Sequence, residues 1–235
     1  MKIPILLLVT AVAVAGCGPA APRAAAGPAI RLAATLDSPT DVTLRWSGVD
    51  PRAAGCVVEF TSDPAEPFVV LRFLPPGETR LRHPDLIPQT VFSYRVRPYS
   101  GPVSNTVEVA LPPGDLDEDA HRDDPAWAAP RVASGPAVAT APVRDPAAAP
   151  TGLRAAVADA NGIVFTWTDH AAGEEGFLLE AAAPPAGAFH VVAVLDPDVV
   201  RFGLVTLPTE KRAAYRVRAY YHGDPSATVT VHTGG

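Results

Sequence analysis

One pattern, used twice at a constant spacing, limits what this chain can fold into. Trp46 and Trp167 are 121 positions apart, and each lies on a short segment in which apolar residues alternate with others. Other landmarks keep that offset: Gly55 and Gly176, Glu59 and Glu180, Leu86 and Leu207, and Tyr94 and Tyr215. Beyond Tyr99 the second copy gains one residue, so that Ser104 aligns with Ser226. Several landmarks at one offset indicate a duplicated domain.

The repeated unit has the pattern of short β-strands. Ile163, Phe165 and Trp167 point to one side of a strand, and the residues between them point to the other. The first copy has strand-like segments at about 29–36, 41–47, 56–61, 67–74, 78–83, 90–98 and 103–111, separated by Pro, Gly, Asp and Ser. The 27 prolines argue against long helices. Seven short strands per copy predict an all-β chain of two antiparallel sandwiches.

The inward positions predict a core for each copy. In the first copy they are Leu32, Val42, Leu44, Trp46, Cys56, Val58, Phe60, Val70, Leu81, Leu86, Phe92, Tyr94, Val96, Val107 and Val109. In the second copy they are Leu153, Val157, Ile163, Phe165, Trp167, Phe177, Leu179, Val192, Val194, Phe202, Leu204, Leu207, Tyr215, Val217, Val229 and Val231. Cys56 has no cationic or histidine neighbour in sequence, which favours a buried structural cysteine.

Each copy contains several motifs that occur together in one known family. In the first copy they are Trp46, the run from Leu86 to Phe92, Tyr94-Arg95-Val96-Arg97 and Ser104-Asn105-Thr106-Val107. In the second they are Pro150-Thr151-Gly152-Leu153, Trp167-Thr168-Asp169 and Glu175-Gly176-Phe177. With these residues both copies resemble fibronectin type III domains of bacterial surface proteins. The resemblance implies immunoglobulin-like β-sandwiches at 28–112 and 148–233. Phe92 and Ala213 replace the family's corner tyrosine, so neither corner should have its hydroxyl hydrogen bond.

The N-terminus has the pattern of a secretory signal. Residues 1–16 contain Lys2 and an apolar run too short for a stable membrane span. The run ends in Val-Ala-Gly-Cys, which resembles the bacterial lipobox and implies cleavage before Cys17, lipidation of its thiol and acylation of the new N-terminus. Several acyl chains, palmitate among them, would give stable membrane attachment. The alternative is an ordinary signal peptide with Cys17 incidental.

Residues 17–27 are expected to form a flexible tether. The residue after the cysteine is Gly18 rather than aspartate, which by resemblance favours the outer over the inner membrane.

An acidic, then Pro/Ala-rich linker is expected at 113–147. Asp115, Asp117 and Asp119 alternate like the first ligands of a calcium loop, whereas the sixth and twelfth positions, which should be glycine and glutamate, are both alanine. A solvated acidic linker is therefore favoured over a calcium site. Trp127 is isolated there and either packs on a neighbouring domain or contacts a partner.

Few charged residues elsewhere point to chemistry. Glu59 with Arg95, and Glu180 with Arg216, are expected to form outward-facing cross-strand pairs. The six histidines have no metal-ligand spacing, and phosphate loops and nucleophile elbows are missing from the sequence. The net charge is −6 without a basic face, which argues against nucleic-acid binding. We therefore expect neither an enzyme nor a cofactor.

The sequence thus predicts a non-catalytic envelope lipoprotein. Its tandem modules would act as a protein-interaction or scaffold unit at the membrane surface, attached through Cys17 and bound to an envelope protein. One alternative is a surface carbohydrate-binding or adhesion protein, whose aromatic platforms would be Trp127, Tyr99, Tyr220 and Tyr221. Another is an accessory subunit of an envelope enzyme complex.

Overall fold

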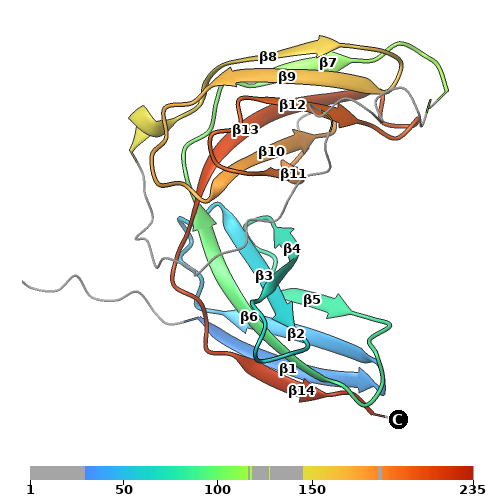
Figure 1. Ribbon diagram of the computed structural model, residues 1–235, viewed down its shortest axis with the longest axis vertical. Coiled ribbons are helices and arrows are strands. Elements are labelled where there is room, and N and C mark those ends of the chain that lie inside the picture. Colours follow the sequence, from blue (N-terminus) through green and yellow to red (C-terminus); the bar gives the residue numbers. More distant parts are fainter. Residues whose placement is uncertain (1–29, 116, 118–126, 128–144, 185–186, 235) are drawn as a thin grey trace, which may run out of the picture.

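The protein is all-β, as the strand pattern predicts. The computed structural model describes residues 30–115, 117, 127, 145–184 and 187–234, which form fourteen strands and a 3₁₀ turn, η2 (Pro146–Ala148) (Figure 1). Within those ranges, helices of the length and hydropathy needed to cross a membrane do not occur.

Two sheets pack face to face in each half of the molecule. In the first half one sheet has the order β1-β2-β5, formed by β1 (Arg31–Ser38), β2 (Asp41–Ser47) and β5 (Arg80–His83). The facing sheet contains β3 (Gly55–Thr61), β4 (Val69–Leu74) and β6 (Val91–Ser100). Val42, Leu44 and Trp46 point inward from β2, because alternate residues of a strand share one face.

The second half repeats this arrangement. One sheet has the order β12-β9-β8, formed by β8 (Thr151–Val157), β9 (Gly162–Thr168) and β12 (Arg201–Val205). The other contains β10 (Gly176–Ala182), β11 (His190–Leu195) and β13 (Arg212–His222). Even the β-bulges repeat, since the register shifts between Val58 and Glu59 in the first half and between Leu179 and Glu180 in the second.

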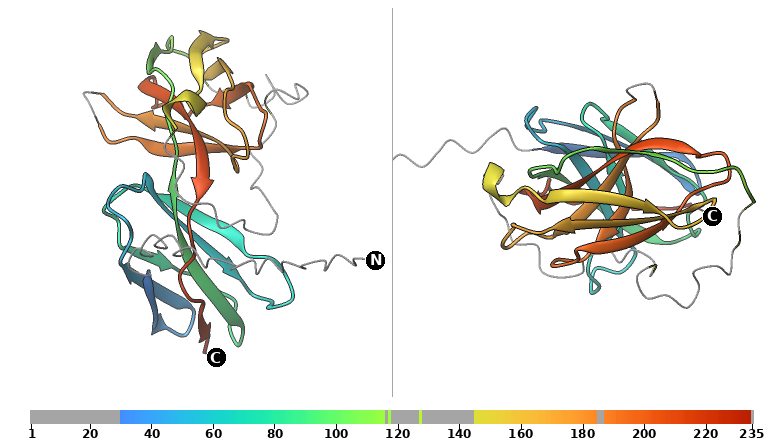
Figure 2. Two further views of the ribbon diagram at one scale, coloured as in Figure 1. Left: turned by 90° about the vertical axis from the view of Figure 1, so that its left-hand side faces the viewer. Right: turned by 90° about the horizontal axis from the view of Figure 1, so that it is seen from above.

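The last strand of each repeat belongs to the opposite half. β7 (Val107–Ala110) follows β6 in sequence but pairs with β13, and β14 (Val229–His232) follows β13 but pairs with β6. The registers correspond, because Val107 lies opposite Tyr215 and Val229 lies opposite Tyr94. The segment after β6 and the segment after β13 therefore run past each other at the waist of the molecule (Figure 2).

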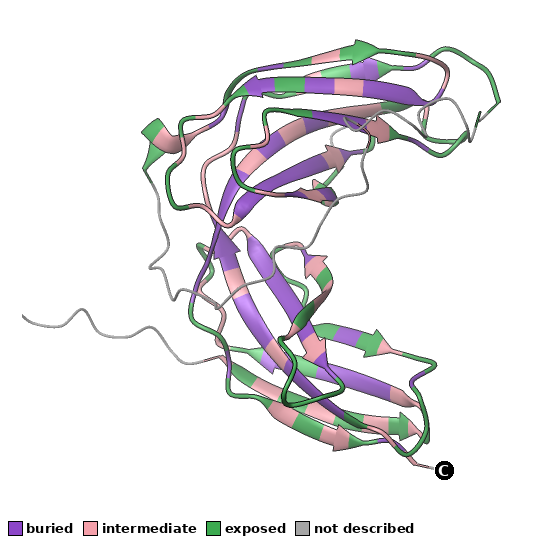
Figure 3. Cartoon of the chain, viewed as in Figure 1, coloured by how far each residue is buried: buried purple, intermediate pink, exposed green. Residues whose placement is uncertain are grey.

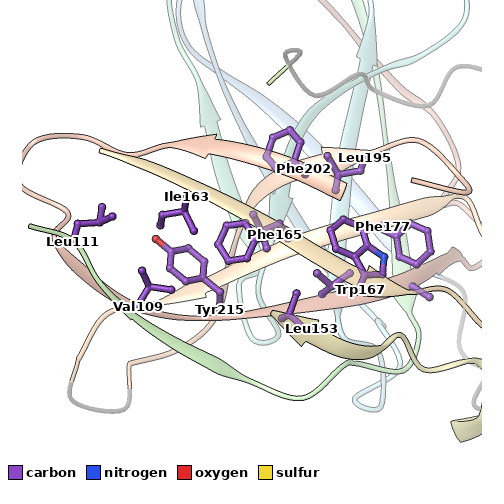
Figure 4. Close-up of a cluster of buried hydrophobic side chains, with 14 residues drawn as sticks. Val109, Leu111, Leu153, Ile163, Phe165, Trp167, Phe177, Leu195, Phe202 and Tyr215 are labelled. Carbon is purple, nitrogen blue, oxygen red and sulfur yellow. The ribbon is translucent and has the colours of Figure 1, made fainter. Parts of the chain in front are cut away.

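The exchange redistributes residues between the two cores. Val109 and Leu111 lie in the core of the second half, beside Ile163 and Tyr215 (Figure 4), and Val107 packs against the same core. Val229 and Val231 pack against the first core. The sequence correctly places the four valines on inward positions of their strands but assigns each strand to the wrong core. The ranges 28–112 and 148–233 treat each sandwich as one continuous segment, whereas each is built from two.

Two parts of the predicted core lie elsewhere. Leu207 is 60% exposed, although its expected counterpart Leu86 is 6% exposed. The hydrogen bond from Leu86 N–H to Thr40 O is matched by one from Thr206 N–H to Asn161 O, so Thr206 takes the inward position. The turn after Thr206 contains one more residue than the turn after Leu86, so that Tyr94 and Tyr215 are again 121 positions apart.

The second discrepancy concerns strand phase. In β11 the inward residues are Ala193 and Leu195, which lie opposite Leu179 and Phe177, rather than Val192 and Val194. Val192 is the extra residue of the bulge in β11 and is exposed. In β4 the residues that pack against the first core are Leu71 and Leu74 rather than Val70. Val157, at the end of β8, is also exposed. Figure 3 shows how buried and exposed residues alternate along the strands.

Candidate functional site

The most unusual chemistry lies at the junction, where β6 and β13 cross between the sandwiches. Tyr99 lies opposite His222, and Ser100 opposite Tyr221, which joins strands of both halves in one sheet of order β11-β10-β13-β6-β3-β4. Backbone hydrogen bonds from Ala219 N–H to Pro102 O and from Gly223 N–H to Pro98 O flank the crossing at 3.2 and 2.8 Å. The junction is therefore part of the folded structure rather than a linker.

An aromatic cluster fills the centre of the junction. The ring of Phe73 meets Tyr99 edge to face at 5.3 Å between centroids, and Tyr220 in the same way at 5.7 Å. Burial raises the pKa of both tyrosines, which stay protonated at neutral pH. The contact fixes the two halves because Phe73 comes from the first and Tyr220 from the second.

Buried charges lie beside these rings. Arg97 is 2% exposed, and its Nε donates only a 3.4 Å hydrogen bond to Gly223 O, while Nη2 has no hydrogen-bond partner. Burial lowers the pKa of Arg97. Burial and the nearby cations Arg97 and Arg95 lower the pKa of His222 to about 3, so this histidine is neutral at physiological pH. Burial raises the pKa of Glu175, whose Oε1 lies 3.8 Å from His222 Nδ1.

The repeat counterpart of Arg97 has a different environment. Arg218 donates through Nη1 to Gly101 O at 2.6 Å, as Arg97 donates to Gly223 O. Arg218 also donates through Nε to Glu180 at 2.7 Å, and Arg216 donates through Nε to the same carboxylate at 2.6 Å. One carboxylate therefore pairs with two guanidinium groups on this side of the junction.

A cleft of about 640 Å³ opens beside this three-residue cluster. The first half lines it with Arg52, Pro75 and Tyr99, among others, and the second half with Phe189, Arg216, Arg218 and Glu180. Clefts of this size between domains are common ligand sites. Residues from both halves meet here only because the strands cross.

The predicted cross-strand pairs are present, in a more buried form than expected. Glu59 lies opposite Arg95, and Glu180 opposite Arg216, with N–O distances of 2.5 and 2.6 Å. Both glutamates lie on the outer faces of their sheets, as expected, but they are buried there. Aromatic rings account for the covering: Arg95 lies over the Phe68 ring at 4.3 Å from the centroid, and Arg216 over Phe189 at 3.9 Å.

The structure describes only some of the predicted lipidation and metal residues. Cys17 and Asp119 lie outside the described residues. Asp115 and Asp117 are exposed, and the backbone oxygen of Asp115 accepts a hydrogen bond from Asn161 Nδ2 at 2.9 Å. Within the described ranges, a different trio brings carboxylate oxygens within 4.8 Å of one another and could hold a metal ion: Asp169, Glu174 and Asp198.

The thiol expected to be structural is buried. Cys56 is a free cysteine in the first core, and burial raises its pKa to about 11, so the reactive thiolate is not populated at neutral pH.

Three of the four proposed carbohydrate platforms are wrong. Tyr99, Tyr220 and Tyr221 are buried, so their faces cannot stack on a sugar. Trp127 packs on the second sandwich, where a Cβ added to Gly203 of β12 would lie 2.2 Å from its ring. Of the two alternatives for Trp127, the structure therefore shows packing on a neighbouring domain.

Comparisons with known proteins add little beyond this architecture. No family model matches the chain. No curated protein matches it either. Among solved structures, a two-domain fibronectin type III segment of chicken tenascin aligns at 13% identity over 86% of this chain and 98% of its own, with a TM-score of 0.26. The FN1–FN3 domains of chicken CNTN1 align at 13% identity over 87% of this chain and 97% of their own, with a TM-score of 0.26. The fold assignment rests on the strand pairing described above.

The sequence did not predict that Arg97, Glu175 and His222 lie together, buried at the junction. They come from three segments that meet only through the strand exchange. The single available signal is the repeat alignment, which places Ala54 at the position of Glu175 and so marks Glu175 as a departure from the repeat.

Proposed function

We propose that this chain is a non-catalytic envelope lipoprotein whose two interlocked sandwiches form a rigid scaffold for a protein partner. The observation that carries the proposal is the reciprocal exchange of β7 and β14. Domains joined by a simple linker are expected to move relative to one another unless their interface is large and apolar. Here each sandwich contains a strand of the other, and the aromatic cluster packs between them.

A fixed angle suits a scaffold, because a partner that contacts both halves does not have to order them on binding. The strands on either side of the connector at 113–147, β7 and β8, both belong to the second sandwich. Two short segments cross the waist instead, 101–106 and 223–228.

The anchor belongs to the same proposal. Lipidation at Cys17 would hold the scaffold at the envelope membrane, and Gly18 favours the outer membrane. Alkyne-palmitate labelling in a bacterial host tests this part. We expect label on the wild-type chain and its loss in Cys17→Ser, together with loss of membrane fractionation. Equal labelling of both chains would contradict the anchor.

The scaffold role is tested by crosslinking in the native membrane followed by mass spectrometry. Photo-crosslinkers at exposed Ile87 and Leu207 sample opposite sandwiches. If the chain is a scaffold, repeated crosslinking of the full anchored chain should recover the same specific partner each time. Recovery of only abundant envelope proteins, equally from a chain disrupted by Gly101→Ala, would overturn the proposal.

A further inference from the structure

We propose that the cleft at the junction binds a carboxylate-bearing segment of the protein partner, with Arg216 as its principal contact. This inference rests on the proposed scaffold function and names the chemistry by which that partner is recognised. Three observations support it: the unused N–H groups of Arg216, the excess positive charge of the cleft, and walls formed by residues of both sandwiches.

Arg216 is held in place with its terminal nitrogens unused. Its Nε donates to Glu180 and its plane lies over Phe189. Within the described residues, Nη1 and Nη2 donate no hydrogen bond, and the side chain is 25% exposed. A guanidinium edge fixed in this way presents two parallel N–H donors, the geometry that binds a carboxylate through both oxygens.

The cleft carries more positive than negative charge. Three arginines line it, Arg52, Arg216 and Arg218, against the single carboxylate of Glu180. Asp50 pairs with Arg52 at 2.8 Å, which still leaves the arginines in excess. The whole chain has a net charge of −6, so this local excess opposes the overall charge. An anionic group is thereby drawn to the cleft rather than to the surface in general.

The shape favours a peptide segment over a flat surface contact. The volume of about 640 Å³ admits several side chains. The walls include Pro75, Pro76, Pro102 and Phe189, which supply apolar contact beside the arginines. A partner segment with an acidic side chain next to small or apolar residues fits this combination.

The repeat supplies a matched control. Arg95 is the counterpart of Arg216, because it pairs with Glu59 and lies over Phe68, but it does not line the cleft. Replacing either arginine removes the same type of ion pair and ring contact. Only Arg216→Gln removes a cleft donor.

The test uses the full chain, purified in detergent, and a fluorescent hexapeptide of alternating glutamate and glycine. Its control is the same peptide with glutamine. We expect the glutamate peptide to bind, Arg216→Gln to weaken binding about tenfold, and Arg95→Gln to leave it unchanged. Arg52→Glu is a second variant that should fold, because Arg52 is 69% exposed, and it should also weaken binding.

The proposed cleft site would be wrong if both peptides bound equally well. It would also be wrong if Arg216→Gln and Arg95→Gln lost the same amount of peptide affinity. Unchanged binding in Arg52→Glu together with Arg216→Gln would contradict the site too. Membrane crosslinking separates this failure from that of the scaffold. If Arg216→Gln still crosslinks to the partner, the proposed cleft site is wrong and the scaffold function is unaffected. If the wild-type chain crosslinks to no partner, the scaffold function is wrong, and the peptide-binding result still holds.

Discussion

Ser104 and Ser226 make the same pair of hydrogen bonds in opposite sandwiches. Ser104 N–H donates to Val217 O at 2.8 Å, and its Oγ accepts from Val217 N–H at 3.0 Å. Ser226 N–H donates to Val96 O at 2.8 Å, and its Oγ accepts from Val96 N–H at 3.0 Å. Each serine lies three residues before an exchanged strand, β7 or β14. The two receiving edges are therefore equivalent down to individual atoms.

This equivalence predicts that each edge accepts a strand supplied separately. A chain ending at Thr228 lacks β14 and leaves the β6 edge open. We expect it to lose roughly 2–4 kcal/mol of stability, since Val229 and Val231 leave the first core, and to lose hydrogen-exchange protection along β6. A synthetic peptide of residues 224–235 should restore that protection.

A peptide of residues 102–111 should restore it too, because β7 and β14 have the same register on their partners. A 224–235 peptide with Val229→Asp and Val231→Asp is the matched control and should have no effect. Full protection of β6 in the truncated chain without any peptide would show that β14 is dispensable, contrary to the prediction.

Gly101 makes the crossing possible. Its φ is +149°, and an added Cβ would lie 1.8 Å from Ala219 O. We expect Gly101→Ala to destabilise the protein by more than about 4 kcal/mol, because a buried backbone atom must move. Gly77→Ala is the control: its φ is +94° but nothing lies within 4 Å, so it should cost only about 1–2 kcal/mol. Urea unfolding measures both, and equal losses would remove the steric explanation.

The repeat predicts the fold of each sandwich but not the exchange between them. Alternation and turn residues identify the strands because they reflect local geometry. Which of two sandwiches a strand joins depends on the path of 101–106 and 223–228. The two last strands, Ser-Asn-Thr-Val-Glu-Val and Ser-Ala-Thr-Val-Thr-Val, are so similar that either edge suits either strand. The cleft and the Arg97 environment arise from that path, so sequence periodicity cannot locate them.

Trp127 reports on contact between the connector and the second sandwich. Gly203 provides the space for its ring, whereas the counterpart in the first repeat is Arg82. We expect Gly203→Arg to displace the ring, shift tryptophan emission to longer wavelength and cost about 1 kcal/mol through lost apolar contact. Trp46 and Trp167 are buried in the cores and should not respond. In Trp127→Phe, Gly203→Arg should cause no further shift; a persisting shift would contradict the contact.

The junction should make the protein less stable in acid. The folded pKa of His222 is about 3, below the value near 6.5 expected for the unfolded chain. The unfolded state therefore binds the proton first, and the free energy of unfolding should fall as pH drops from about 6.5 toward 3, by up to about 1.4 kcal/mol per pH unit.

Glu175 acts in the opposite sense. Its pKa is raised in the folded state, so its protonation stabilises the fold as pH falls toward the unfolded value, and part of the loss due to His222 is offset there. His222→Gln keeps a polar side chain that cannot titrate in this range. We expect urea unfolding of this variant to lose the fall in stability that begins as the pH drops below about 6.5, the unfolded pKa of His222. Glu175→Gln should retain that dependence, because it leaves the histidine beside Arg97. If His222→Gln and the wild type lose stability in parallel over this pH range, another group is responsible and His222 is not neutralised by its burial at the junction.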